Sequence, residues 1–263
     1  MTAEASDEYC LAEGESAKLL TGHLWRRFVV LGDSVAEGLC EPVPGYSELQ
    51  WADRLAAELR AAAPSLEYLN LGVSGLRAHE IRASQLERAV AFRPDLALVV
   101  GGGNDAFSAR YNADADAVDA ELSAMVTALQ SAGADVITLG MFNVSYSPAV
   151  VEWLRPGLRE RMSRLAERTR AMSERLGTIH VHLTDHPLST DPTLYSAVVC
   201  GLTALIFLLL AWVIPGRAAA IAGRGVSLAL HAGTLVAGAA GGGRAILGIR
   251  EAIRGASSLL RRR

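Results

Sequence analysis

The sequence predicts an α/β protein, a three-layer sandwich with a five-stranded parallel sheet. Short apolar runs alternate with stretches of helical periodicity between residues 26 and 183, and the first and third runs lead directly into Gly32 and Gly101. Strands that alternate with helices form parallel sheets whose two faces are both covered. Right-handed crossovers then wind the helices onto both sides of the sheet.

The expected elements follow one another along the chain. Strands are predicted at 28–31, 66–71, 95–100, 135–139 and 178–183. Helices are predicted at 49–63, 80–92 and 117–131, and one or two more at 151–176, where Pro156 breaks or starts the longer one. Ligands of such sheets bind at the carboxyl ends of the strands, so the loops that follow these strands are the first place to look for a site.

The chain has two parts that differ in charge and composition. Residues 1–196 carry 17 basic and 27 acidic side chains, whereas residues 197–263 carry eight arginines and one acidic residue, Glu251. The later part is also more apolar and richer in glycine and alanine. We therefore expect a polar lead-in at 1–25, a globular domain at 26–196 and a hydrophobic, basic tail at 197–263.

The tail contains candidate membrane segments. Residues 197–214 form an uncharged run that is long enough for a short transmembrane helix. A buried helix of a soluble protein is the alternative. Residues 226–243 are a weaker candidate, with Gly238 and Gly242 at a spacing that permits close helix contact. Residues 246–263 fit a basic amphipathic helix on an anionic membrane surface.

Location follows from the charges and the amino terminus. Residues 1–20 have neither the positive start nor the apolar core of a signal peptide. A hairpin of two spans would keep both the globular domain and the tail arginines on the cytoplasmic side. We expect membrane association through 197–214 with a cytoplasmic globular domain.

The first strand ends in Gly32-Asp33-Ser34. A serine at that place lies on a tight turn at the edge of the sheet, where the amides of a following helix favour developing negative charge. The same three residues also suit an ordinary turn with a helix cap. The turn alone therefore leaves open whether Ser34 is a nucleophile.

Two further glycine-rich loops follow the second and third strands. The second strand leads into Asn70-Leu71-Gly72, and the third into Gly101-Gly102-Gly103-Asn104-Asp105. Glycine lets the backbone approach a ligand closely, so the Gly72 N–H and the Asn104 side chain are candidates to bind one oxyanion. Plain strand-to-helix turns are the alternative for each loop.

Taken together, the three loops resemble the SGNH hydrolase family, also called GDSL esterases and lipases. Gly32-Asp33-Ser34 is similar to its first block, Gly72 to its second and Gly102-Gly103-Asn104-Asp105 to its third. The resemblance covers about residues 26–196. It implies a flavodoxin-like sandwich and hydrolysis of acyl esters without metal or other cofactor. It also implies that Ser34 is the nucleophile, with the Ser34 N–H, Gly72 N–H and Asn104 side chain as the oxyanion hole.

The family's fourth block, an Asp-x-x-His that supplies the catalytic base, is not found. None of the six histidines has an aspartate three positions before it; these are His23, His79, His180, His182, His186 and His231. Serine needs a base to act as a nucleophile at neutral pH. His186 is the candidate substitute, with Asp191 better placed than the adjacent Asp185 to orient it. A surface loop histidine is the alternative. His180 and His182 are expected to pack beneath a helix.

The sequence gives little support for a metal site, a disulfide framework or nucleic-acid binding. Three scattered cysteines and carboxylates without partners at ligand spacing predict no metal site or disulfide framework. A near-neutral balance and few aromatic residues give no nucleic-acid signature. The arginines of 155–175 alternate with glutamates, which indicates a solvated helix face.

Two functions remain. The first is a serine esterase that acts on a small-molecule or lipid acyl ester. The second is a catalytically impaired relative that serves as a binding or scaffold module on a membrane, its catalytic histidine lost.

Overall fold

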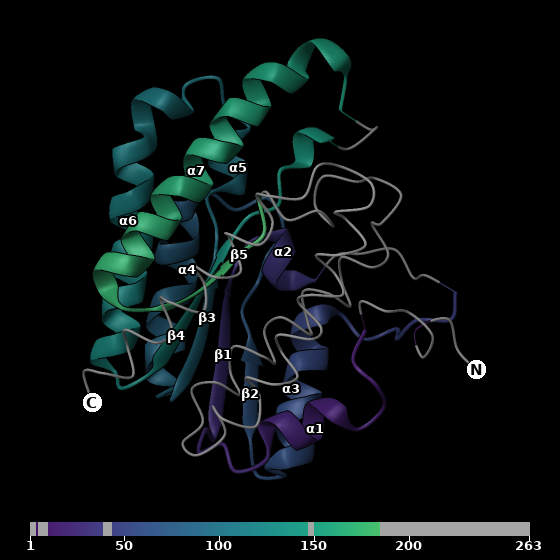
Figure 1. The fold of residues 1–263 in the computed structure, drawn as a ribbon. Coiled ribbons are helices and arrows are strands. Elements are labelled where there is room, and N and C mark those ends of the chain that lie inside the picture. The colour runs from purple at the N-terminus through teal and green to yellow at the C-terminus, as the bar shows by residue number, and fades with distance from the viewer. Residues whose placement is uncertain (1–3, 5–9, 39–43, 147–149, 185–263) are drawn as a thin grey trace. The chain divides into compact units, whose positions relative to one another are not determined.

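The structure is a computed structural model that describes residues 4, 10–38, 44–146 and 150–184 (Figure 1). The chain forms two compact units. The described part of the first unit lies within Met1–Leu24 and Pro42–Pro64, and that of the second within Trp25–Glu41 and Ser65–Thr193. The predicted boundary at residue 196 and the tail at 197–263 lie outside the described residues.

The first unit contains α1 (Glu15–Leu20) and α3 (Trp51–Ala62), which pack against each other. Trp51, Leu55 and Leu59 are buried on α3, as their spacing predicted. Helix α1 lies in the expected polar lead-in and was not predicted; Leu20 at its end is fully buried.

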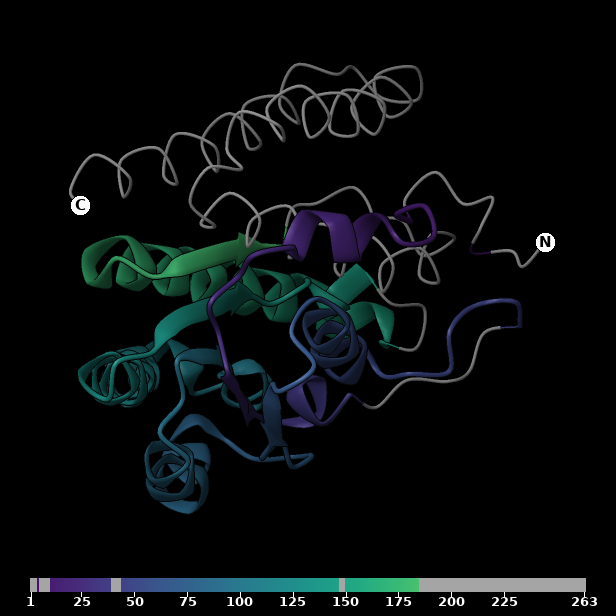
Figure 2. The same ribbon diagram turned by 90° about the horizontal axis from the view of Figure 1, so that it is seen from below.

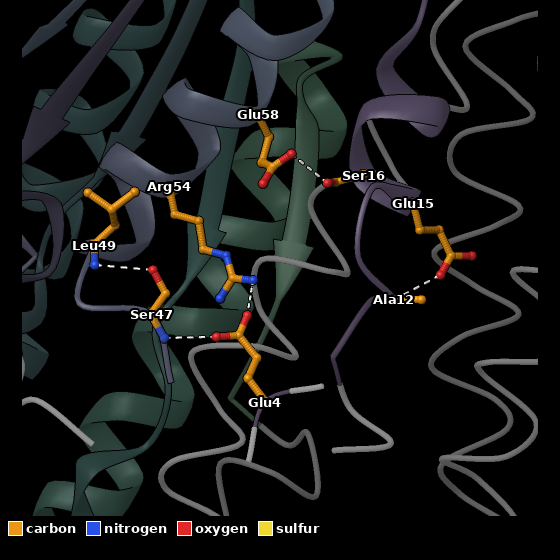
Figure 3. A network of polar contacts seen from close by, with 8 residues as sticks. All are labelled: Glu4, Ala12, Glu15, Ser16, Ser47, Leu49, Arg54 and Glu58. Atoms are coloured by element: carbon orange, nitrogen blue, oxygen red, sulfur yellow. Dashed lines mark hydrogen bonds and ion pairs between the residues drawn. The ribbon is translucent and has the colours of Figure 1, made fainter. Parts of the chain in front are cut away.

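Polar contacts join the segments of this unit (Figure 3). Ser16 of α1 donates its hydroxyl to a carboxylate oxygen of Glu58 at 2.5 Å. Glu4 forms an ion pair with Arg54 and accepts from the Ser47 N–H at 2.8 Å. The Nε2 of His23 donates to the carbonyl of Leu59 at 2.9 Å.

The second unit is built on a parallel sheet of five strands in the order β2-β1-β3-β4-β5. Every prediction of a strand is confirmed, with bounds that shift by at most one residue. The strands are β1 (Arg27–Gly32), β2 (Glu67–Asn70), β3 (Leu96–Val100), β4 (Asp135–Gly140) and β5 (Ile179–His182). Val30 of β1 pairs with Asn70 on one side and Leu98 on the other, so β1 lies inside the sheet.

Three long helices of this unit lie on the same side of the sheet (Figure 2). They are α4 (Ala78–Ala91), α6 (Tyr111–Ser131) and α7 (Arg155–Leu176). Pro156 lies in the first turn of α7, and therefore starts that helix rather than breaking it. Helix α6 begins six residues before the predicted start, because Tyr111, only 1% exposed, already packs into the core. The third layer of the predicted sandwich involves a helix of the other unit and stays a prediction.

Carboxylates join the strands at the amino end of the sheet. Asp95 accepts the backbone N–H groups of Arg26 and Arg27 at 2.7 and 2.8 Å. Asp135 accepts from the indole of Trp25 at 3.0 Å. These bonds hold the starts of β1, β3 and β4 together, which leaves the opposite edge to the loops that follow the strands.

Candidate active site

Ser34 lies directly after β1, as the first residue of α2 (Ser34–Glu37). The helix expected after this serine is only four residues long and ends at Gly38 in a left-handed conformation. Ser34 is partly exposed, and within the described residues its hydroxyl makes no hydrogen bond. The nucleophile candidate is thus reachable from solvent and has no base beside it among these residues.

Asp33 is the buried carboxylate of the site. It is 1% exposed and caps α2 by accepting the Val35 N–H at 3.0 Å. Its other oxygen lies 3.5 Å from the side-chain nitrogen of Asn104. Burial raises the pKa of Asp33 to about 6; the Val35 hydrogen bond opposes this shift and the nearby charge of Asp105 adds to it. The carboxylate therefore links the serine turn to the third loop.

Gly72 fits against α2 so closely that no side chain has room there. A β-carbon at this position would lie 2.3 Å from the Glu37 nitrogen and 2.8 Å from the β-carbon of Ala36. Asn70 supports the contact by donating to the carbonyl of Ala36 at 2.8 Å. Its carbonyl oxygen accepts the Gly72 N–H at 2.9 Å. Gly72 was among the predicted site residues but Asn70 was not, because the role of Asn70 depends on a contact 34 residues away.

The third loop holds the end of the second. Asn104, in the short helix α5 (Gly103–Ala106), donates to the carbonyl of Leu76 at 2.9 Å. Its neighbour Asp105 accepts the N–H of Ala78 at 2.9 Å, at the start of α4. These two bonds fix the loop between β2 and α4. The structure thus brings Ser34, Gly72 and Asn104 to one edge of the sheet.

The family comparison agrees with this arrangement. Residues 30–199 match the model of the GDSL-like Lipase/Acylhydrolase family. The chain belongs to this family. Membership places it among the carboxylic ester hydrolases, as the three glycine-rich blocks predicted. A search of curated proteins finds no match.

Solved structures of an acetylxylan esterase and of an α/β hydrolase share the fold. An acetylxylan esterase from Geobacillus stearothermophilus is 15% identical, with a TM-score of 0.51 over 69% of this chain and 93% of that one. An α/β hydrolase enzyme from the metagenome of Lake Arreo, Spain, is 18% identical, with a TM-score of 0.52 over 69% and 94%. At these identities the likeness concerns the fold.

His186, the predicted base, lies outside the described residues, as do Asp185 and Asp191. Within the described chain, His180 lies on β5 with its Nδ1 3.0 Å from the Thr138 hydroxyl and 3.3 Å from that of Ser173 on α7. Desolvation by burial, followed by the charges of His182 and Arg170, lowers the pKa of His180 to about 4. His180 is therefore a neutral residue packed beneath α7, as predicted.

Two further expectations concern metal and membrane. The described residues contain no group of three or more His, Cys, Asp or Glu side chains arranged to hold a metal ion. They also contain no helix with the length and hydropathy to cross a membrane. The candidate spans at 197–214 and 226–243 lie beyond the described part of the chain.

Proposed function

We propose that this chain is a serine esterase in which the Ser34 hydroxyl attacks the carbonyl carbon of an acyl ester. The observation that carries the proposal is the contact of Gly72 with α2 together with the link from Asp33 to Asn104. These contacts gather the three loops around the one serine. Attack forms an acyl-enzyme and releases the alcohol, and water then releases the acid.

The oxyanion formed by this attack would accept from the Ser34 N–H, the Gly72 N–H and the Asn104 side chain. In the structure the Gly72 N–H donates to Asn70 and the Asn104 amide donates to Leu76. An oxyanion carries a full charge and is a stronger acceptor than either neutral carbonyl, so it would share or displace these bonds. Removing one such donor costs roughly a hundredfold to a thousandfold in kcat.

The base in this proposal is His186, oriented by Asp191. Three of the matched structures are catalytic mutants of the Geobacillus stearothermophilus enzyme, at a serine, an aspartate and a histidine. An enzyme of the same fold therefore relies on all three residue types. His186→Ala should reduce hydrolysis as strongly as the loss of the serine, because members of such a triad act as a unit.

The test is ester hydrolysis by the full-length protein in detergent. An activated acetyl ester is the first substrate, because the matched neighbours include acetylxylan esterases. We expect Ser34→Ala to lower the rate by about a hundredfold or more. Ser131→Ala, on the exposed end of α6, is the matched control and should keep the wild-type rate. Equal background rates for wild type and Ser34→Ala in folded samples would refute the esterase.

The missing Asp-x-x-His favours a second candidate, a relative that binds without turnover. A fluorophosphonate discriminates between the two, because it reacts covalently only with an activated serine. Stoichiometric labelling of Ser34, located by peptide mass spectrometry, supports the esterase. A folded protein that stays unlabelled yet binds a non-hydrolysable ester analogue supports the binding module.

Membrane attachment through 197–214 is part of the proposal for the whole chain. The uncharged sequence of this run supports it. Extraction of membranes with alkaline carbonate tests it: a spanning chain stays with the bilayer, and a peripheral one is released. Release of the full-length protein would refute the span.

A further inference from the structure

Large apolar side chains project into solvent just before α7. Val151, Trp153 and Leu154 are 56%, 77% and 42% exposed. They lie in or next to the short 3-10 helix η3 (Glu152–Leu154). Single exposed apolar residues are ordinary on protein surfaces, but a contiguous apolar group marks a site of interaction.

Phe107 is a further exposed apolar side chain, on a second loop that contacts α7. It follows α5 and is 54% exposed. Arg161 of α7 donates to the carbonyl of Ala106 at 2.7 Å, so the end of α5 lies beside the second turn of α7 (Figure 1). Arg155 donates to the carbonyl of Val150 at 2.9 Å and holds η3 to the start of the same helix. We call the group just before α7 the apolar patch; it consists of Val151, Trp153 and Leu154.

Arginines beside the apolar patch carry charge that no carboxylate neutralises within the described residues. Arg155 and Arg161 use their guanidinium groups on backbone carbonyls. Arg159 donates to the Ser145 hydroxyl at 3.3 Å and lies 4.4 Å from the centre of the Tyr146 ring. Residues 151–164 hold four arginines and two glutamates, so the surroundings of the patch are positively charged.

The other half of α7 shows that this is not a property of the whole helix. Arg168 forms ion pairs with Asp116 and with Asp119. Arg170 pairs with Glu174 one turn further on. Within the described residues, Arg168 and Arg170 on the later half of α7 thus have carboxylate partners, whereas the arginines beside the apolar patch do not.

We infer that the apolar patch and its arginines form a docking surface for an anionic lipid bilayer. Tryptophan and leucine insert at the level of lipid headgroups, and neighbouring arginines attract anionic lipids. The positive end of the α7 dipole adds to this attraction. A second copy of the chain fits less well, because symmetric association through this patch would bring the same unpaired arginines face to face. This surface is separate from the tail at 197–263, and the inference holds whether or not Ser34 is active.

Tryptophan fluorescence in the full-length protein tests the insertion. Trp25 and Trp51 are 7% exposed, and Trp212 is removed as Trp212→Phe, so Trp153 is left as the reporter that can reach lipid. Vesicles of zwitterionic and anionic phospholipid with brominated acyl chains should quench this variant. Adding Trp153→Phe should abolish the quenching, and because the side chain is exposed the change should not disturb folding. Failure of the vesicles to quench Trp212→Phe overturns the inference, even if the protein sediments with them.

A matched pair of variants tests the charge. Arg159→Gln should weaken partitioning into vesicles that contain anionic lipid by roughly fivefold at low salt, the effect of one basic residue near such a surface. Arg159→Lys keeps the charge and should bind like wild type. Equal binding of both variants, or equal binding of wild type to purely zwitterionic vesicles, overturns the anionic specificity.

Discussion

The side chain of Gln85 makes a two-way pairing with the peptide of Gly32. The Gly32 N–H donates to the Gln85 Oε1, and the Gln85 Nε2 donates back to the Gly32 carbonyl, both at 2.9 Å. Gln85 lies on α4 and is 2% exposed. Because Gly32 is the last residue of β1, this pairing fixes the point from which the Ser34 turn departs.

Replacing Gln85 by leucine should leave the buried Gly32 N–H without its partner, whereas the Gly32 carbonyl keeps the Val73 N–H at 3.1 Å. Such a group costs about 1 to 3 kcal/mol, so we expect the free energy of unfolding to fall by that amount. Ester hydrolysis should fall with it, because the turn loses its support. Urea unfolding and the acetyl-ester assay measure the two effects. Gln130→Leu is the control, since Gln130 donates one bond to Leu176 away from the site; an equal loss of activity there would contradict the role of Gln85.

Asp33 predicts a pH dependence of stability. Its pKa is raised from 3.8 to about 6, so the native state binds its proton more tightly than the unfolded chain does. The resulting stabilisation is fully present below about pH 3.8 and is lost as the pH rises through about 6. The side chain of Asp33→Asn stays neutral at every pH. As the pH rises from about 4 to about 7, wild type should therefore lose about 3 kcal/mol of unfolding free energy that the variant keeps. The measurement is urea unfolding of wild type and variant at both pH values. If the two proteins differ in free energy of unfolding by the same amount at both, Asp33 is not the titrating group.

For His180 we expect the opposite dependence of stability on pH. Its pKa is lowered from 6.5 to about 4, so the unfolded chain binds the proton more tightly. The stabilisation is present above about pH 6.5 and is lost as the pH falls through about 4. His180→Gln keeps a group that can bond to Thr138 and removes the titration. We expect the variant to lose about 3 kcal/mol less than wild type on acidification, measured by urea unfolding. If His180→Gln loses as much stability as wild type when the pH is lowered, the prediction is wrong.

Gly72→Ala tests the close approach of the second loop to α2. The new β-carbon would lie 2.3 Å from the Glu37 nitrogen, so the backbone must move. We expect a loss of stability of about 3 kcal/mol, as for other overpacked sites, and a loss of esterase activity. Gly75→Ala is the comparison in the same loop: nothing lies within 4 Å of its β-carbon, but its φ is +82°. That variant should cost only about 1 kcal/mol, from the left-handed backbone alone. Similar losses for both would show that the steric contact is unimportant.

Local patterns predicted the strands, the four long helices and the three loops of the site, because hydrophobic periodicity and glycine positions can be read from neighbouring residues. They did not predict the short helix α1. The partners of those loops were not predictable in the same way. Gln85 lies 53 residues from Gly32, and nothing in a helical stretch distinguishes a buried glutamine from an exposed one. The early start of α6 escaped prediction because Tyr111 is followed by the polar residues of an exposed helix face, which hide its buried position. The role of His186 stays a prediction.

The side-chain hydrogen bonds that hold the three loops of the site lie within one segment of the chain. Those involving Gly32, Asp33, Gly72 and Asn104, with the bond from Asp105 to Ala78, all join groups between residues 32 and 105. The side chains that gather the three loops therefore come from one segment of the chain, and α7 supports it from outside through the bond from Arg161 to the Ala106 carbonyl. Under the proposed function, joining a segment with Asp-x-x-His after Thr184 should supply an imidazole to loops that the segment 32–105 already holds together. We therefore expect that a protein engineer can exchange the base of this chain while keeping the loops proposed to bind the ester carbonyl.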